Sequence, residues 1–419
     1  MRPAFAAFSA AFSIVVAVLP GFARAQDAVI ITATRFADSR SELPVGVTLI
    51  TADDLRKSAS SNLAEILAQF GLLHIRDNAG TPNPQLDLRG FGATGDQNTL
   101  VLLDGVRISE NEQLPAQLSR IPLESVERIE ILRGGGAVLY GGGASGGTVN
   151  IITRAPRAGE KSVLLFGGAG SYGTRELRAG VARHGDVLGL SVALSDEDTR
   201  GYRRNNRFQQ TNLAGSLEAH GGNGRAHLRF GYEEQSLRLA GSLTEAQIAA
   251  DPRQTLTPED TSRRDGGQLV LGGAWRQGRS ELSADLAWRD KRASAFFALF
   301  GGFYTDTRAE SWSFTPRAKF AFDAFGRAQE VVLGAEFEHW DYGSRSAASP
   351  ATIGTPFSQR IGEQSNAALY AQASLWAGPA TRLVAGARAQ RNRDRLAEQV
   401  FPMDERGAKR TLQAYELAA

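Results

Sequence analysis

Three glycines in the first half of the chain have the GxGxxG spacing of dinucleotide-binding proteins; they are Gly141, Gly143 and Gly146. That fingerprint needs a strand before the glycines and a helix after them, because the helix N-terminus holds the phosphates. Here a β-prone run from Thr148 to Thr153 follows, and no Lys-Ser/Thr pair closes a phosphate loop. The glycines therefore predict tight backbone packing and positive φ angles, and they are poor material for a helix.

The other residue types that could do chemistry form no readable constellation. The five histidines lack metal-ligand spacing, and no Ser/His/Asp or Cys/His arrangement is found; they are His74, His184, His220, His227 and His339. There is no cysteine, which excludes a disulfide scaffold and a thiolate metal site. We therefore expect neither an enzyme nor a resident cofactor or metal, and we expect the histidines to be polar fillers.

Composition sets the class of protein. The 419 residues include 46 glycines and are 42% hydrophobic, which is too polar for a helical membrane protein and suits a β-barrel. The formal charge of +2 equals the two leader arginines, Arg2 and Arg24, so the rest is about neutral and no nucleic-acid partner is indicated. Residues 1–25 read as a secretory signal, with an apolar run to Leu19 and the A-x-A site Ala23-Arg24-Ala25.

The densest sequence signal runs from Ile121 to Arg154. A helix-like turn from Pro122 to Glu127 leads into an alternating strand over 126–132, and the glycines and the second strand follow. Together with Leu86–Gly92 (LDLRGFG) and Val101–Val106 (VLLDGV) upstream, this stretch resembles the plug domain of TonB-dependent outer-membrane receptors. The resemblance covers about 27–154 by motif, and the remainder only by pattern.

The resemblance implies roles for short plug segments. The first residues after the leader, 27–35, resemble the box that pairs with TonB, and a β-prone segment at a terminus could also be the first strand of the plug. We expect TonB binding by Asp27, Ala28, Val29, Ile30, Ile31 and Thr32. The loops 91–98 and 109–114 correspond to apices that touch ligand, or else are solvated turns; the candidates are Gly95, Asp96, Gln97, Asn98, Glu110, Asn111 and Gln113.

Arg89 and Arg133 each precede a glycine at a strand end. In the family, arginines at these places pair with barrel carboxylates and lock the plug, whereas water-facing side chains are the alternative. The plug itself reads as a small α+β unit, with a strand over 45–50, helix starts at Thr51 and Asn62, and Gly71 as a C-cap.

From Glu160 onward the pattern is that of a transmembrane β-barrel. Apolar and polar residues alternate in segments of about ten, as where Ala226, Leu228, Phe230 and Tyr232 oppose Arg225, His227 and Arg229. Twelve strands are predicted, over 161–170, 174–183, 187–195, 209–219, 225–234, 264–276, 280–289, 311–321, 329–340, 363–376, 381–390 and 410–419. The links alternate between short turns, expected in the periplasm, and long loops, expected outside the cell; the long ones are 196–208, 235–263, 290–310, 341–362 and 391–409.

The predicted organisation is a signal peptide (1–25), a TonB-box segment (26–35), a plug (36–157) and a partial barrel (158–419). Because plugged barrels of this kind close with 22 strands, twelve suggest an incomplete receptor; a genuine twelve-strand closed barrel is the alternative. We expect a monomeric outer-membrane receptor, in contact with lipid, that takes up a ferric siderophore. Cobalamin is the alternative ligand, and a passive porin or surface adhesin is the alternative class. The acidic run Asp196-Glu197-Asp198 is either a calcium site, as in cobalamin receptors of the family, or a solvated loop.

Overall fold

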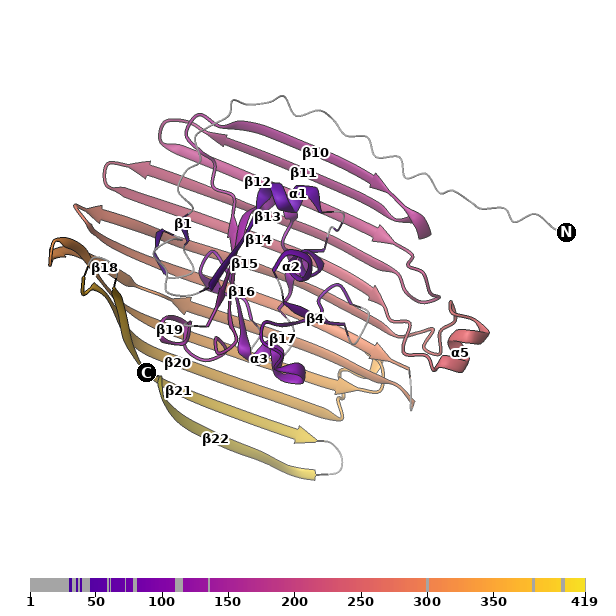
Figure 1. Cartoon of the computed structure of the whole chain (residues 1–419). Helices are drawn as coiled ribbons and strands as arrows, with labels where there is room; N and C mark the ends of the chain where they lie inside the picture. The colour runs from indigo at the N-terminus through magenta and orange to yellow at the C-terminus, as the bar shows by residue number, and fades with distance from the viewer. Residues whose placement is uncertain are drawn as a thin grey trace.

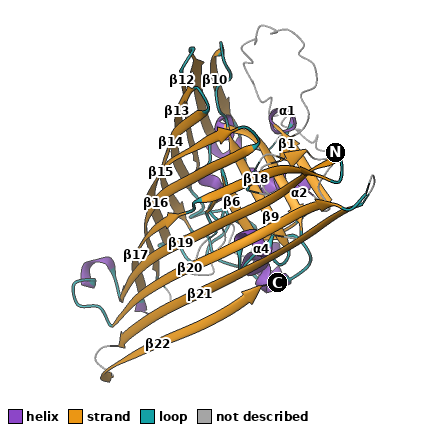
Figure 2. Ribbon diagram, turned by 90° about the vertical axis from the view of Figure 1, so that its left-hand side faces the viewer, coloured by secondary structure: helices purple, strands orange, loops and turns teal. Residues whose placement is uncertain are grey.

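The computed structural model consists of one large curved antiparallel sheet with a small α+β domain against its concave face (Figure 1). Turned by 90°, the sheet forms a tilted wall and the small domain lies on one side of it (Figure 2). The structure describes residues 30–31, 35–36, 38–39, 46–58, 60, 62–71, 73–77, 81–109, 116–134, 136–298, 301–378, 381–400 and 404–418. The leader and most of the predicted TonB box lie outside these ranges.

The small domain, hereafter the plug, is built on a five-stranded sheet of order β3-β8-β9-β6-β7. All neighbours in it are antiparallel except β6 and β9, which run parallel. Its strands are β3 (Gly46–Thr51), β6 (Thr99–Leu103), β7 (Val106–Arg107), β8 (Val126–Arg133) and β9 (Gly147–Thr153). Smaller pairs are formed by β1 (Ile30–Ile31) with β2 (Asp38–Ser39) and by β4 (His74–Arg76) with β5 (Gln85–Asp87).

Both helices expected in the plug are present. The first, α1 (Ala52–Lys57), begins with a capping box in which Thr51 accepts from the Asp54 amide and Asp54 accepts from the Thr51 amide. The second, α2 (Leu63–Gly71), buries Leu63, Ile66 and Leu67 on one face, in the core that β3, β8 and β9 also line.

Gly71 was expected to cap α2 and instead is its last helical residue. A Cβ built on it would lie 2.6 Å from the Ile131 side chain of β8, so close packing explains the glycine.

The glycine-dense segment differs from the prediction in one respect, since the short helix α4 (Ala137–Tyr140) lies within it. The four residues between Gly136 and Gly141 are free of glycine, which permits one turn, and Gly141 ends it at φ +73°. Gly147 has φ +143° and a Cβ there would lie 2.3 Å from the Leu132 carbonyl oxygen. Strand β9 then follows directly, so the helix of a dinucleotide-binding motif is not formed.

The segment 91–98 was expected to be a loop and contains two short helical turns, Gly92–Thr94 and α3 (Gly95–Asn98). Other helical turns are Leu118–Arg120, Leu123–Ser125, Ser171–Gly173, Pro350–Thr352 and α5 (Glu245–Ala250). No helix among the described residues is both long and apolar enough to cross a membrane.

The large sheet has the twelve predicted strand positions, each paired antiparallel with the next along the chain. Among the described residues β10 pairs only with β11 and β22 only with β21, so the sheet is an open wall. The strands are β10 (Lys161–Ala169), β11 (Arg175–His184), β12 (Leu188–Thr199), β13 (Phe208–Gly221), β14 (Gly224–Arg238), β15 (Thr261–Gln277), β16 (Ser280–Phe297), β17 (Phe303–Phe314), β18 (Arg317–Ala324), β19 (Arg327–Ala347), β20 (Ser358–Trp376), β21 (Arg382–Val400) and β22 (Asp404–Ala418).

Two predictions about these strands were wrong in detail. The predicted strand 311–321 is two strands, β17 and β18, which share the neighbours β16 and β19 and are interrupted at Thr315-Pro316. Proline has no amide to donate to the ladder, which explains the break. In addition, most strands extend into the predicted long loops; β16, for example, continues to Phe297. The extensions are rich in polar and charged residues and lack a sustained alternation of apolar and polar residues.

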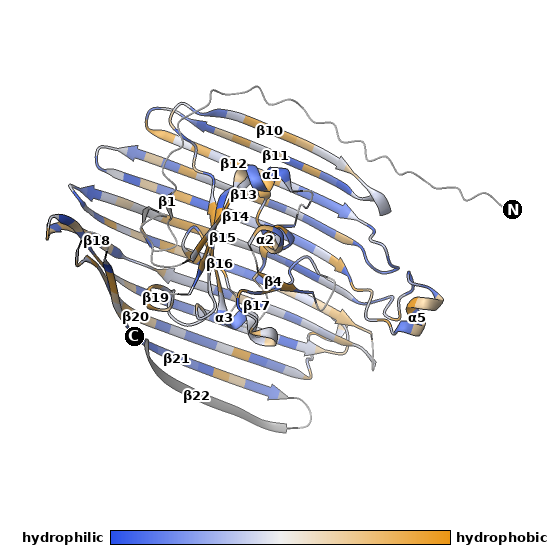
Figure 3. Ribbon diagram, viewed as in Figure 1, coloured by the Kyte–Doolittle hydropathy of each residue, from blue (hydrophilic) through white to orange (hydrophobic). Residues whose placement is uncertain are grey.

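The two faces of the wall differ in polarity. Along β14 the even-numbered Tyr232 is exposed on the convex face, whereas the odd-numbered Glu233 and Gln235 are buried toward the plug. Figure 3 shows hydrophobic and hydrophilic residues alternating along the strands. The convex face exposes large apolar side chains on many strands, among them Val163, Leu165, Leu217, Leu271, Leu333, Leu369 and Leu383. This is the apolar-out, polar-in arrangement that the sequence predicted.

Candidate functional site at the plug–barrel interface

A buried arginine ties the N-terminal segment to both the plug and the wall. Arg35 has φ +76° and is 8% exposed. Its guanidinium donates to the Leu139 carbonyl from Nε (3.2 Å) and Nη2 (2.9 Å), and Nη2 also lies 2.9 Å from the Glu336 carboxylate on β19. The same guanidinium stacks 3.9 Å above the centre of the Tyr140 ring. We call this arrangement the Arg35 knot.

The Arg35 knot is closed by further charged and aromatic residues from the wall. Arg388 of β21 is 2% exposed, and its Nη1 lies 3.5 Å from the same oxygen of Glu336. Tyr370 of β20 covers Arg35 from another side at 5.6 Å. Burial raises the pKa of the Tyr140 hydroxyl to about 12, so this ring is neutral in the physiological range. One carboxylate thus holds two buried cations, and removing it would leave both without their partner.

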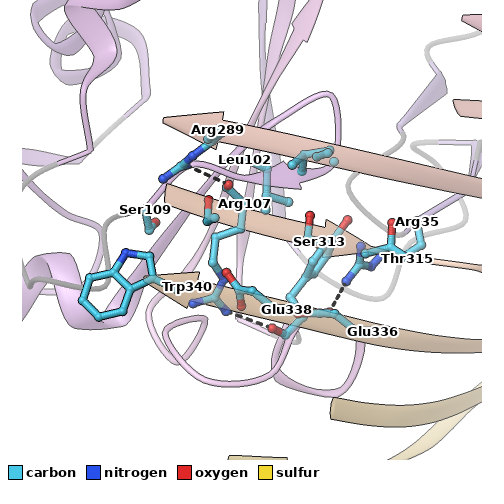
Figure 4. A pocket seen from close by; sticks show the side chains of 15 residues that line it. Arg35, Leu102, Arg107, Ser109, Arg289, Ser313, Thr315, Glu336, Glu338 and Trp340 are labelled. Atoms are coloured by element: carbon cyan, nitrogen blue, oxygen red, sulfur yellow. Dashed lines mark hydrogen bonds and ion pairs between the residues drawn. The ribbon is translucent and has the colours of Figure 1, made fainter. Parts of the chain in front are cut away.

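A narrow polar cavity of about 30 Å³ adjoins the Arg35 knot between the plug and the wall. Figure 4 shows Arg107 of the plug extending beside Glu336 and Glu338. Arg289 lies at the end of the cavity away from Arg35. Arg289 donates from Nη1 to the Arg107 carbonyl at 3.0 Å. This volume is on the scale of single water molecules, so the plug and the wall are closely packed at this place.

Further ion pairs join the plug to the wall. Glu124 lies 2.9 Å from Arg178, Asp104 lies 3.4 Å from Arg229, and the less tight pair of Arg120 and Glu233 is 3.8 Å apart. Burial raises the pKa of Glu124, an effect that Arg178 opposes. These contacts are spread over strands β11 and β14, so the plug is held across a wide part of the wall.

The predicted lock residues are Arg89 and Arg133. Among the described residues, neither of them forms an ion pair with a carboxylate of the wall. Arg133 donates to the Thr48 hydroxyl at 2.7 Å and to the Gly71 carbonyl, both within the plug. Arg89 is exposed, and the described residues contain no ion pair between it and a carboxylate. Their lock role therefore stays a prediction. Sequence reasoning missed Arg35, although it is the single charged residue between Asp27 and Asp38, which is an available signal.

The predicted apical residues are described only in part. Gly95 is buried, and a Cβ there would lie 2.8 Å from the Leu86 carbonyl oxygen. Asp96 accepts weakly from the Leu86 amide at 3.3 Å, and burial raises its pKa. Asn98 donates to the Thr94 carbonyl, whereas Gln97 is exposed. Glu110, Asn111 and Gln113 lie outside the described residues, and their role stays a prediction.

The predicted TonB-binding segment is described at two residues, Ile30 and Ile31. Their backbone forms β1, which pairs with β2. Asp27, Ala28, Val29 and Thr32 lie outside the described residues, so TonB binding stays a prediction.

The remaining candidates for chemistry are engaged in contacts within the wall. His227 of β14 faces the interior and lies 2.9 Å from Asp285, which also binds Arg317 at 2.7 Å. In the acidic run, Asp196 accepts from Thr211 and Asp198 pairs with Arg207. Within the described ranges, no group of three His, Cys, Asp or Glu side chains is arranged to hold a metal ion.

A small α+β domain held by ion pairs against the polar, concave face of an antiparallel wall is the architecture of a plugged β-barrel. The comparisons with known proteins agree. Residues 39–148 match the family described as TonB-dependent Receptor Plug Domain. Residues 39–148 are therefore a plug domain like that of TonB-dependent receptors.

Relatives in that family have different ligands in their names. The vitamin B12 transporter BtuB of Vibrio cholerae is 36% identical over 183 residues, which are 43% of this chain and 29% of the relative. The ferric enterobactin receptor PirA of Pseudomonas aeruginosa is 39% identical over 126 residues, 26% of this chain and 17% of the relative. The matches thus span less than a third of the length of these curated relatives.

Solved structures share the fold over most of the chain. The unliganded ferric citrate transporter FecA gives a TM-score of 0.79 at 17% identity, over 89% of this chain and 60% of that one. The ferripyoverdine receptor of Pseudomonas aeruginosa gives 0.75 at 14% identity, over 93% and 56%.

Proposed function

We propose that this chain acts as a TonB-dependent outer-membrane receptor for the energy-coupled uptake of a ferric siderophore. Its steps are binding and release, with no covalent chemistry. The observation that carries the proposal is the Arg35 knot, because it connects the segment resembling the TonB box to the plug and the wall at one point.

Force applied to residues 27–32 would act on the β1–β2 pair and on Arg35 before it reached the five-stranded sheet of the plug. Since Arg35 bonds both Leu139 of the plug and Glu336 of the wall, withdrawing it would separate the two domains beside the polar cavity. A cavity of about 30 Å³ is far too small for a metal chelate, so passage along this part of the interface would need such a rearrangement. The plug domain on the concave face of the wall favours the receptor over a passive porin, whose lumen holds no such domain.

Ligand capture is assigned to the plug apices and the long loops. Gln97 is the best-placed apical candidate because its side chain is exposed, whereas Gly95 is buried within the plug. Cobalamin is the second candidate ligand, and the identity with BtuB of Vibrio cholerae favours it.

The test is growth of a strain in which this protein is the one receptor of its class. Supplying single ferric siderophores under iron limitation, and cobalamin in a cobalamin auxotroph, separates the two ligands. TonB-dependent growth on one siderophore is the expected result. Growth that continues when TonB is deleted would reject energy-coupled uptake, and growth with cobalamin alone would reject the siderophore.

A further inference from the structure

Two glutamates lie directly opposite each other on neighbouring strands of the wall. Glu176 of β11 and Glu197 of β12 are register partners. Both face the plug, because Arg178, two residues along β11 from Glu176, binds a carboxylate of the plug. Side chains in such a pair have Cβ atoms about 5 Å apart, and like charges there repel each other. The pair is therefore unfavourable unless a cation or a proton joins it.

The cation at this place is shared between the plug and the wall. Arg178 lies 3.1 Å from the Glu176 carboxylate through Nε, and 2.9 Å from the Glu124 carboxylate of the plug through Nη1. Its guanidinium also lies 3.9 Å from the centre of the Phe166 ring of β10, which holds it in place. One positive charge thus serves carboxylates from both domains.

Glu124 is seated closely against the wall. Its helical turn, Leu123–Ser125, contacts β11 and β12, and a Cβ built on Gly180 of β11 would lie 3.7 Å from the Glu124 Cβ. The Glu124 side chain is 7% exposed, and its Oε2 is buried and accepts no hydrogen bond among the described residues. A buried carboxylate oxygen without a donor indicates that the cluster lacks a cation or a proton. Since no described group of acidic or histidine side chains has the arrangement of a metal site, a proton is favoured.

The surroundings of Glu197 suit a group that binds this proton. The charged groups that act on it are Glu176 and Arg178 of β11 and Glu65 of α2, whereas β13 presents the uncharged Gln210 opposite it. Burial raises the pKa of Glu197 to about 7; the two other glutamates add to this effect, and the arginine opposes it. Glu197 lies in the part of β12 that extends into the predicted long loop, outside the membrane. Its charge therefore changes within the physiological range.

We propose that Glu176 and Glu197 form a proton-operated switch that sets how tightly this corner of the plug is held against the wall. With a proton taken up from water, the neutral Glu197 carboxyl donates to the Glu176 carboxylate, and Arg178 stays with Glu124 of the plug. After the proton has returned to water, the charged Glu197 competes with Glu124 for Arg178, and it repels Glu65 of α2. The switch goes beyond the proposed uptake, because it regulates the docking of the plug whatever ligand is carried.

The direction of the effect follows from the two states of Glu197. With the plug away from the wall, its carboxyl would be solvated and have an ordinary pKa of about 4.3. Docking raises this pKa, so the contribution of Glu197 to docking is fully present below about pH 4.3 and is lost as the pH rises through about 7. Acid should therefore fasten this corner of the plug, and alkali should loosen it.

The test measures the distance between nitroxide labels on the plug and the wall in the full chain, by pulsed electron paramagnetic resonance. The sequence contains no cysteine, so Gln69→Cys on α2 and Val163→Cys on the convex face of β10 supply two specific sites, both exposed. Distances are recorded at about pH 5.5 and about pH 8.5, on either side of the expected transition. Glu197→Gln has an amide in place of the neutral carboxyl. The matched control, Glu363→Gln, removes an exposed strand carboxylate that is paired with Arg395.

In the labelled parent chain we expect a longer-distance population that rises at least about threefold between the two pH values. Glu363→Gln should respond in the same way, whereas Glu197→Gln should keep the shorter distance at both. Arg178→Gln, with its fold verified by circular dichroism, should show the longer distance at both, because it loses the pair with Glu124.

Three results would overturn the proposal. The first is a distance distribution that does not change with pH in the labelled parent chain, and the second is a pH response that persists in Glu197→Gln. The third is a response that a metal chelator abolishes, which would show that the cluster holds a cation in place of a proton.

Discussion

The Arg35 guanidinium and the Glu336 carboxylate lie 2.9 Å apart, although 301 positions separate them in the chain. Arg35 belongs to the segment before the plug, and Glu336 to the ninth strand position of the wall, strand β19. Both side chains are less than a tenth exposed. The N-terminal segment, the plug and the wall are therefore connected through one buried ion pair, which makes it the most informative site to change.

Removing either partner of this pair should release the N-terminal segment. Glu336→Gln leaves two buried guanidinium groups without their carboxylate, and Arg35→Ala leaves Glu336 paired with Arg388 alone. Breaking a buried ion pair by removing one partner lowers stability by about 3–5 kcal/mol. We expect a spin label at Val29 to become more mobile in both variants, as a narrower electron paramagnetic resonance spectrum. The exposed pair Arg345–Asp306 supplies the control variant Asp306→Asn. Unchanged spectra in both knot variants would contradict the proposed role of the Arg35 knot.

Proline in the predicted TonB box should abolish uptake and leave ligand binding intact. Val29→Pro and Ile30→Pro remove an amide donor and prevent strand pairing, and deletion of 27–32 removes the segment altogether. Val29→Thr keeps the amide and the β-branched shape and is expected to transport normally. Radiolabelled ligand binding and uptake, measured on the same cells, separate the two steps. Uptake that persists with proline would show that this segment is merely the first strand of the plug.

Acid should loosen the loop that follows β5. The Asp87 carboxylate accepts from the amides of Arg89, Gly90, Phe91 and Gly92 at 2.7–3.1 Å. Burial alone would raise the pKa of Asp87, but these four donors outweigh it and lower the pKa below its ordinary value.

A lowered folded-state pKa means that the stabilisation is present above the unfolded-state value of about 3.9 and is lost as pH falls through the folded value. We therefore expect hydrogen-exchange protection of the Gly90 and Gly92 amides to fall below about pH 4. In Asp87→Asn the protection should be low throughout and independent of pH in this range. Protection that is equally strong in the unmodified chain on both sides of this range would contradict the assignment.

Gly147 should not tolerate a side chain. Gly147→Ala combines φ +143° with a contact to the Leu132 carbonyl oxygen, and we expect a loss of more than about 2 kcal/mol in plug stability. Gly46→Ala is the control, because nothing lies within 4 Å of the position that its added methyl group would take and its φ is ordinary. Limited proteolysis of the plug in the full chain measures the difference. Equal resistance of the two variants would show that β8 and β9 can move apart at little cost.

Local patterns predicted most of the architecture. Alternation along β10 to β22 indicated the number and order of the strands, and Thr51-Ala52-Asp53-Asp54 indicated the start of α1. Strand ends were missed because the extensions lack a sustained alternation of apolar and polar residues. The division into β17 and β18 was missed although Pro316 within the run signals it.

The ion pairs of the interface could not be predicted in this way. No local rule pairs Arg35 with Glu336 across 301 positions, since the pairing depends on how the plug docks on the wall. Arg133 shows the same limit, because its bonds to Thr48 and Gly71 depend on the internal packing of the plug, which the Arg-Gly step in the sequence does not indicate.

The hydrogen bonds of the Arg203 guanidinium have a consequence for the conformational entropy of the long loop between β14 and β15. By joining Ala240, Gly241 and Gln254 through their carbonyls, this side chain orders the β14–β15 link before any ligand arrives. A ligand that enters an ordered site does not have to offset the conformational entropy of fixing a loop, which is about 1–2 kcal/mol for each backbone residue. Replacing Arg203 should therefore add the conformational entropy of ordering the β14–β15 link to the cost of binding any ligand at these loops.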